Sequence, residues 1–160
     1  MSLEVYKTYL NDHLAGSVAA IELVDHLREL SNNPEREALL SRLRSEIEED
    51  QTVLRELLKE VGGSESKFRK AAAWLTEKLG EAKLKLDHPE GGELQWLEAL
   101  ETLGLGIQGK LALWRALEAA RDRKPDLQSL DLGRLMNRAL EQLQWVESER
   151  LQVARRALSD

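Results

Sequence analysis

Apolar residues recur three or four positions apart through four long stretches of this 160-residue chain, and leucine alone supplies 32 residues. This spacing places an apolar stripe along one side of each of four helices. The chain has only three prolines, and a leucine-rich, proline-poor composition favours helix throughout. We therefore expect an all-α protein in which each helix buries one stripe against the others.

The first two helices are bounded by recognisable end signals. We expect the first at about residues 3–30 and the second after Asn32-Asn33-Pro34, with Asn33 as N-cap and Pro34 in the first helical position. The second helix should end at Gly62-Gly63, a common C-terminal signal. The link between the two helices is short, so it predicts an antiparallel hairpin.

A weaker amphipathic segment at about residues 64–86, interrupted by Gly80, connects this hairpin to a second one. After a loop at 88–92, the second hairpin has helices at about 93–121 and 131–158, which Lys124-Pro125-Asp126 separates and Asp131 caps. Two hairpins joined by roughly 30 residues are typical of a four-helix bundle with one long crossover. We expect a single domain, 1–160, with a short helix in that crossover.

Composition excludes several classes of function. The 29 acidic residues outnumber the 23 basic ones, which is unfavourable for binding nucleic acid. Cysteine is absent, so disulfides, thiolate nucleophiles and iron–sulfur sites are excluded. No apolar stretch of about 18 residues predicts a membrane helix, and the N-terminus does not resemble a signal peptide. The expectation is a cytoplasmic protein with neither nucleic acid nor membrane as partner.

Several polar residues fall on the predicted apolar stripes. Antiparallel pairing about a turn at 32–33 brings His13 near Asp50, and a buried carboxylate needs a partner because an isolated charge costs several kcal/mol. His13 is the expected partner of Asp50. In the second hairpin, Gln108 should lie near Gln142. The sequence thus predicts a buried polar cluster of His13, Ser17, Glu46, Asp50 and Gln142.

The segment from Leu10 to Ile21, LNDHLAGSVAAI, resembles the opening helix of bacterioferritin-type members of the ferritin-like superfamily, where the pattern is L-N-x-x-L-x-x-E-x-x-A-I. The resemblance implies a four-helix bundle with a di-iron site, whose ligands are about four carboxylates and two imidazoles. The implied ligand in the first helix is a glutamate, but this chain has Ser17 there.

The other implied ligand positions also differ. The second-helix E-x-x-H is matched only by Glu46 with Glu49, and the third-helix glutamate is replaced by Gln108, next to a retained Gly109. In the last helix, alignment on Trp145 places Ala139 and Gln142 at the E-x-x-H positions, and a rival alignment places Glu141 and Gln144 there. We expect no di-iron centre and no cofactor. Any single metal ion would have to use His13, Glu46 and Asp50.

Three glycines, Gly104, Gly106 and Gly109, lie within the third long helix, where each costs roughly 0.5–1 kcal/mol relative to alanine. Either another helix approaches closely there, or the glycines line a groove that admits a ligand, with Gln108 and Lys110 at its edge. Lys110 itself is expected to be a solvated surface residue.

Trp96 and Trp114 lie five helical turns apart on one helix face and are expected to anchor the core or a subunit interface. Arg115 could pair with Glu141 across the hairpin. The sequence contains no recognisable nucleophile–base set and no phosphate-binding loop, which favours a protein that is not an enzyme.

Three hypotheses for function follow. The first is a non-catalytic ferritin-like protein that acts as an interaction or assembly module, self-associating as a homodimer through an outer helix face. The second is a small-molecule binder that uses the groove near Gly104–Gly109. The third is a divergent metal-binding protein or oxidoreductase with a reduced site.

Overall fold

The computed structural model describes residues 2–86 and 92–159. Within these ranges the chain is all-helical, as predicted, and contains no strand. The loop expected at 88–92 lies almost entirely in 87–91, outside the described residues. The α-helices are α1 (Ser2–Leu30), α2 (Pro34–Glu60), α3 (Glu65–Leu86), α4 (Gly92–Ala120) and α5 (Leu132–Ala157), with two 3-10 turns, η1 (Arg121–Arg123) and η2 (Pro125–Leu127), before α5.

The helix ends confirm the predicted capping. The Asn33 side chain accepts hydrogen bonds from the backbone N–H groups of Glu35 at 2.9 Å and Arg36 at 3.2 Å. Asp131 likewise accepts from the N–H of Arg134 at 2.9 Å. After α2, Gly62 adopts a φ of 67°, a left-handed conformation that favours glycine.

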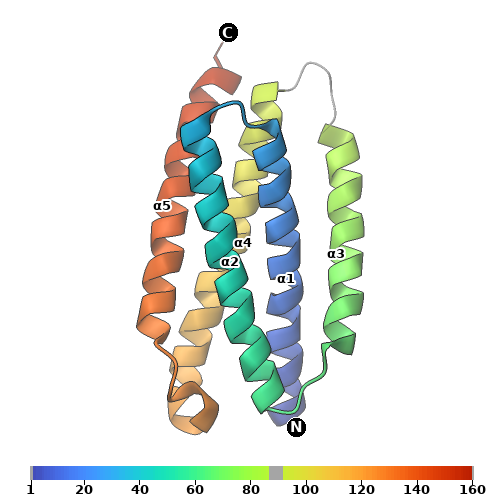
Figure 1. Ribbon diagram of the computed structural model, residues 1–160, viewed down its shortest axis with the longest axis vertical. Helices are drawn as coiled ribbons and strands as arrows, with labels where there is room; N and C mark the ends of the chain where they lie inside the picture. The colour runs from blue at the N-terminus through green and yellow to red at the C-terminus, as the bar shows by residue number, and fades with distance from the viewer. Residues whose placement is uncertain (1, 87–91, 160) are drawn as a thin grey trace.

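The direction of the helices follows from one long connection. α1, α3 and α5 run one way along the molecule, and α2 and α4 run the other way (Figure 1). α3 returns the chain to the end at which α2 began, so α2 and α4 are parallel. The short helix expected in this crossover was wrong, because α3 contains 22 residues. One internal glycine, Gly80, costs only about 1 kcal/mol and does not break a helix whose apolar side is packed.

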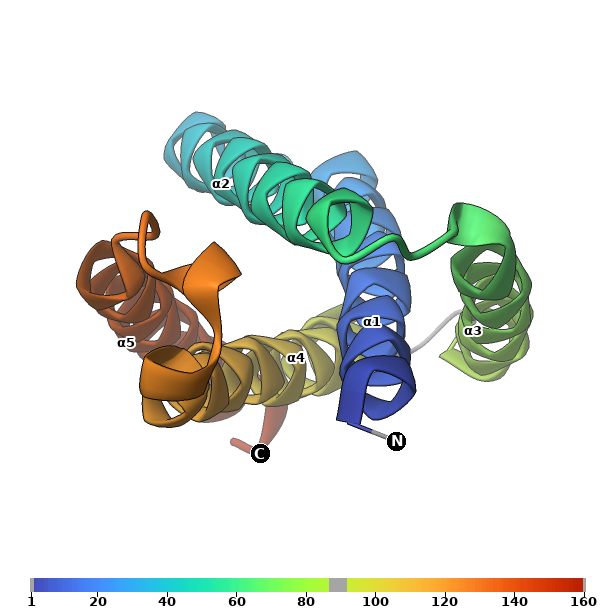
Figure 2. The ribbon, with the colours of Figure 1, turned by 90° about the horizontal axis from the view of Figure 1, so that it is seen from below.

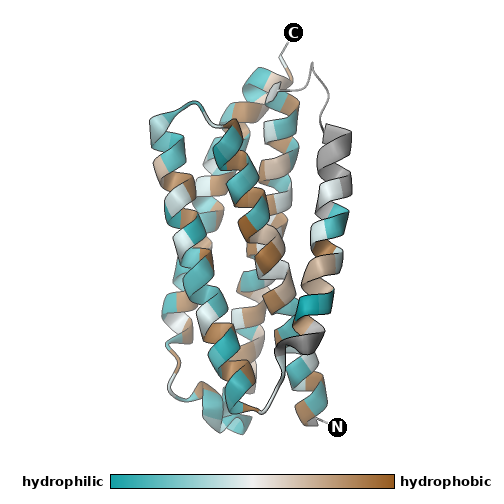
Figure 3. Ribbon diagram, turned by 45° about the vertical axis from the view of Figure 1, so that its right-hand side comes forward, coloured by the Kyte–Doolittle hydropathy of each residue, from teal (hydrophilic) through white to brown (hydrophobic). Residues whose placement is uncertain are grey.

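α1, α2, α4 and α5 surround a common interior, and α3 lies outside them against α1 (Figure 2). Phe68 and Ala72 of α3 are buried and join the core. Hydrophobic and hydrophilic residues alternate along the helices (Figure 3), as helices with one buried side require. In the described part of the chain, no helix is long and apolar enough to cross a membrane.

The core is built mainly from leucine and includes a fully buried tryptophan. Trp114 is 0% exposed and Trp96 is 9% exposed, so both serve as core anchors, as their shared helix face predicted. Trp74 of α3 differs, since it is 58% exposed. After Trp114, the largest fully buried side chains of the described residues are leucines, among them Leu10, Leu14, Leu27, Leu40, Leu100, Leu103 and Leu111.

Candidate functional site

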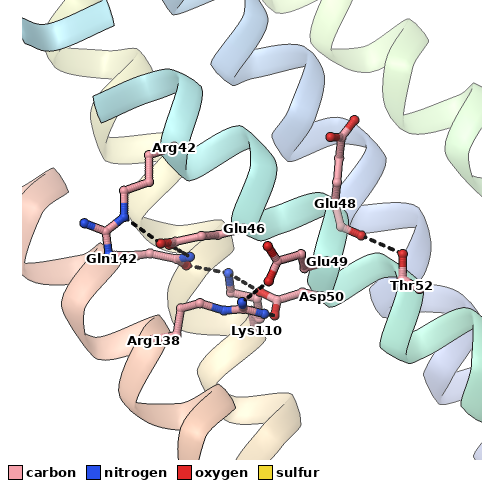
Figure 4. A network of polar contacts seen from close by, with 9 residues as sticks. All are labelled: Arg42, Glu46, Glu48, Glu49, Asp50, Thr52, Lys110, Arg138 and Gln142. Atoms are coloured by element: carbon pink, nitrogen blue, oxygen red, sulfur yellow. Dashed lines mark hydrogen bonds and ion pairs between the residues drawn. The ribbon is translucent and has the colours of Figure 1, made fainter. Parts of the chain in front are cut away.

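A network of charged side chains lies between α2, α4 and α5 (Figure 4). At its centre is the carboxylate of Asp50, on α2, a residue that is only 2% exposed. The ammonium of Lys110, from α4, lies 2.8 Å from one carboxylate oxygen. The guanidinium of Arg138, from α5, donates to the other oxygen and also to Glu49. One buried anion therefore holds cations from two other helices.

Gln142 of α5 extends this network. Its amide oxygen accepts a hydrogen bond from Lys110, and its amide nitrogen donates to Glu46 of α2 at 2.7 Å. Glu46 also accepts from the guanidinium of Arg42 at 2.8 Å. Both ends of the Gln142 amide are satisfied, which is the normal state of a buried side-chain amide.

Helical spacing explains why these residues converge. Glu46 and Asp50 are four residues apart on α2, and Arg138 and Gln142 are four apart on α5, so each pair shares one helix face. Lys110 enters from α4, between the two pairs. These bonds join α2 to α5 across the interior of the molecule.

The charges in the network balance, with Lys110, Arg138 and Arg42 against Asp50, Glu46 and Glu49. Burial lowers the pKa of the Lys110 ammonium, and the adjacent Asp50 carboxylate opposes that effect. Burial alone would raise the pKa of Glu46, but the hydrogen bonds from Gln142 and Arg42 outweigh it, so the pKa is lowered. The arrangement stabilises Glu46 as a carboxylate.

The structure brings together only part of the predicted polar cluster. Glu46, Asp50 and Gln142 belong to the network, whereas His13 and Ser17 do not. The His13 ring packs edge-on against Tyr9, with 4.7 Å between ring centroids. The Ser17 hydroxyl donates to the backbone carbonyl of Leu14 at 2.6 Å, within α1. The expected pairing of His13 with Asp50 was wrong, because Lys110 and Arg138 bind that carboxylate.

Sequence reasoning missed Arg138 as a member of this network, and it placed Lys110 at the edge of the groove near Gly104–Gly109 instead. The expectation that Lys110 is solvated was wrong, since its side chain is only 14% exposed. A signal was present, because Lys110 lies three residues after Ile107 and four before Trp114, on the buried stripe of α4. Arg138, likewise, is three residues after the buried Leu135. Placement on an apolar stripe indicates burial in both cases, a signal that the prediction for Lys110 set aside.

Of the residues predicted to border a groove, Gly104 and Gln108 do so, whereas Gly106, Gly109 and Lys110 are not among its lining residues; the binding of a ligand there stays a prediction. The groove lies between α4 and α5 and is lined by, among others, Gly104, Leu105, Gln108, Leu143 and Val146. Gln108 is exposed there rather than buried against Gln142. The alternative of close helix packing was wrong for Gly106 and Gly109, where an added Cβ would meet nothing within 4 Å.

A smaller pocket of about 120 Å³ lies between α2 and α5, beside the network. Leu39 and Leu43 of α2 and Trp145 of α5 form its apolar part, and Glu46 and Gln142 form its polar part. The indole N–H of Trp145 is buried without a hydrogen-bond partner in the described chain, and such groups are normally satisfied.

The residues of the interior do not fit a di-iron group. A metal site needs several free carboxylate or imidazole donors, but here Lys110 and Arg138 bind the oxygens of Asp50. Among residues 2–86 and 92–159, no three histidine, aspartate or glutamate side chains are arranged to hold a metal ion. The set His13, Glu46 and Asp50 is not brought together. Side-chain cations occupy the centre of this interior.

Comparison of the chain with protein families, with curated proteins and with solved structures found no match. By its fold and its interior, the chain is an all-α protein with a buried ionic network.

Proposed function

We propose that this chain is a non-catalytic, ferritin-like helical protein that acts as an assembly module and self-associates through the outer face of α4, without a di-iron centre. The ferritin-like assignment rests on topology. Two antiparallel hairpins are joined by one long crossover, which makes α2 and α4 parallel (Figure 1), and this connectivity is typical of ferritin-like bundles. An experimental structure in which α2 and α4 run in opposite directions would contradict it.

The absence of a di-iron centre rests on the network. Lys110 and Arg138 supply the positive charge that balances Asp50. A metal cation would have to displace both side chains and leave them buried without a counter-ion, which is strongly unfavourable. We therefore assign the ionic network a structural role, which is to join α2, α4 and α5.

One observation carries the assembly role, namely that the outer face of α4 is exposed and almost uncharged. Leu105, at its centre, is 75% exposed. Between residues 102 and 119, Arg115 and Glu118 are the only charged residues among those that α4 exposes, although 32% of the chain is charged. A helix surface with so few charges is normally covered by another surface, and this face of α4 is uncovered in a single copy of the chain.

Light scattering over a concentration series tests this proposal. We expect a dimer that dissociates on dilution, and we expect Leu105→Glu to be monomeric because it places a charge in the interface. Trp74→Glu is the matched control, since it adds the same charge at an exposed apolar residue of α3 and should leave the dimer intact. A wild-type chain that is monomeric at every concentration would overturn the proposal.

A second candidate function is the binding of a small apolar molecule that carries a hydrogen-bond acceptor. The unpartnered N–H of Trp145 beside the α2–α5 pocket favours it. A pocket of about 120 Å³ is suited to a ligand of a few heavy atoms. Thermal shift with a panel of small aromatic alcohols and ketones tests this candidate, with Leu43→Phe, which fills the pocket, as control. A response that is equal in both proteins would exclude the pocket as the site.

A further inference from the structure

We infer that the partner of α4 is a second copy of this chain, packed antiparallel against it about a twofold axis at Gln108. This inference rests on the proposed self-association through α4 and goes beyond it by giving the symmetry and the register of the contact. It is carried by the charges on the rim of the outer face of α4, which are self-complementary.

Glu101 and Arg115 are 14 residues apart, about four helical turns, and therefore lie on the same flank of α4. Both are exposed. The printed ion pair of Glu101 is a long contact of 3.4 Å with the half-buried Arg150, and the expected pair of Arg115 with Glu141 is not among the ion pairs of the described residues. The midpoint of the two positions is residue 108.

A twofold axis at that midpoint makes the rim complementary to itself. In an isologous interface, residue i meets residue j of the other copy and j meets i. Glu101 then faces the partner's Arg115, and Arg115 faces the partner's Glu101, which gives two ion pairs. Gln108 lies on the same flank at the axis and faces the partner's Gln108. Because an amide both donates and accepts, two glutamines can bond to each other.

The apolar contact fits the same register. With the axis at residue 108, the numbers of two residues that face each other across the dimer add up to about 216. Leu105 therefore lies between the partner's Gly109 and the partner's Ala112. A Cβ built on Gly109 meets nothing within 4 Å, which leaves an open notch beside the exposed Leu105. Small residues allow two helices to approach closely, and a large side chain over the notch fills the space they leave. The glycines that α4 tolerates at a cost thus gain a structural role in the dimer.

Charge reversal tests the register. Glu101→Arg and Arg115→Glu each place like charges together twice per dimer, and each should raise the dissociation constant about tenfold. The double variant, Glu101→Arg with Arg115→Glu, reverses both partners and should return the constant to about the wild-type value. Glu77→Arg, on α3, makes the same charge change as Glu101→Arg and should have no effect.

Cross-linking supplies an independent readout. Since the chain has no cysteine, Gln108→Cys introduces the sole thiol, close to its symmetry mate. We expect a short bis-maleimide to cross-link this variant efficiently and to leave Trp74→Cys uncross-linked. If wild-type chains dimerise but the double variant stays weak or Gln108→Cys does not cross-link, the register is wrong and the assembly function survives. A monomeric wild type would overturn both.

Discussion

Helix α5 is held on two sides by different physical means. Towards α4 the backbones approach closely, and the apolar side chain of Val146 lies 3.7 Å from a Cβ built on Gly104 of α4. Towards α2, the backbones hardly approach each other, and side chains bridge the space. Those bridges are the pairs of Arg138 with Asp50 and of Gln142 with Glu46.

The difference matters because substitutions destabilise the two kinds of contact in different ways. Apolar packing loses stability in proportion to the volume removed. A buried ion pair contributes little net stability relative to apolar residues of similar size, but removing one partner leaves an uncompensated charge. The α4–α5 contact should therefore tolerate conservative changes in size, and the α2–α5 contact should respond sharply to single changes in charge.

Large effects are expected on the apolar side. Leu103→Ala removes a side chain that is 1% exposed and should lower the free energy of unfolding by about 2–5 kcal/mol. Leu105→Ala is the matched control two residues away, 75% exposed, and should change it by less than about 0.5 kcal/mol. Urea unfolding at concentrations where the chain is monomeric measures both. Equal losses in the two variants would contradict the assigned orientation of α4.

The polar side should show a non-additive response. Asp50→Leu leaves Lys110 and Arg138 buried without their shared anion and should cost about 3–5 kcal/mol. Replacing the cations as well, with Lys110→Met and Arg138→Leu in the same chain, should recover most of that loss, because the buried charges are then gone. Urea unfolding of the single and triple variants checks this. If the triple variant is less stable than the single one, the network has a stabilising role that pairwise charge compensation does not explain.

The sequence predicted the helices because their stripes and caps are local signals. Asn33 and Asp131 cap as expected, and the apolar spacing placed Trp114 in the core. The polar interior was less predictable, since pairing by residue number assumes two straight antiparallel helices with aligned axes. That assumption put His13 beside Asp50, whereas the structure places His13 against Tyr9 of the same helix.

The cations of the network were missed for a different reason. Lysine and arginine side chains are mostly exposed in proteins. The prediction for Lys110 followed this general tendency rather than the position of Lys110 on a buried stripe. Arg138 also lies on its stripe, but a carboxylate from another helix determines where its guanidinium points. Such a contact depends on the packing of three helices and has no local signature in the chain.

A third prediction concerns a bridge from α2 to the rest of the molecule. Arg36 donates to Glu149 of α5 at 2.9 Å, and its guanidinium lies 4.8 Å from the ring centroid of Trp96. Arg36→Ala should cost about 1–2 kcal/mol, since it removes an ion pair and a cation–π contact. Arg36→Lys should lower the free energy of unfolding by less, because lysine retains the positive charge, although it lacks the planar guanidinium group.

The control for Arg36 is an ion pair within α5. Glu147 accepts a hydrogen bond from Arg150 at 2.7 Å, and the Glu147 side chain is 53% exposed. Glu147→Ala removes this pair and retains the contact of Arg150 with Glu101 of α4, so it should change the free energy of unfolding by about 0.5 kcal/mol or less. Thermal unfolding of the two alanine variants separates the cases. If Glu147→Ala costs as much as Arg36→Ala, the bridge between helices adds nothing.

The smallest expected effect is the pH dependence that His13 contributes. Burial lowers the pKa of its imidazole below the ordinary value, and Asp12 only partly opposes this. The unfolded chain, with an ordinary pKa of about 6.5, therefore binds this proton more readily than the folded chain. The contribution of His13 to stability is fully present above that value and falls as the pH drops through it towards the folded pKa.

Replacing the histidine isolates this effect. His13→Leu removes the titration and keeps an apolar side chain against Tyr9, so the free energy of unfolding should vary less between about pH 7.5 and 5.5 than in the wild type. The carboxylates that also titrate towards the lower end are common to both chains and cancel in the difference. An equal pH dependence of the two chains would mean that His13 is solvated in the folded chain. If the wild type instead gains stability on acidification relative to His13→Leu, an anion must lie beside the imidazole. That outcome would support the pairing of His13 with Asp50, which the network excludes.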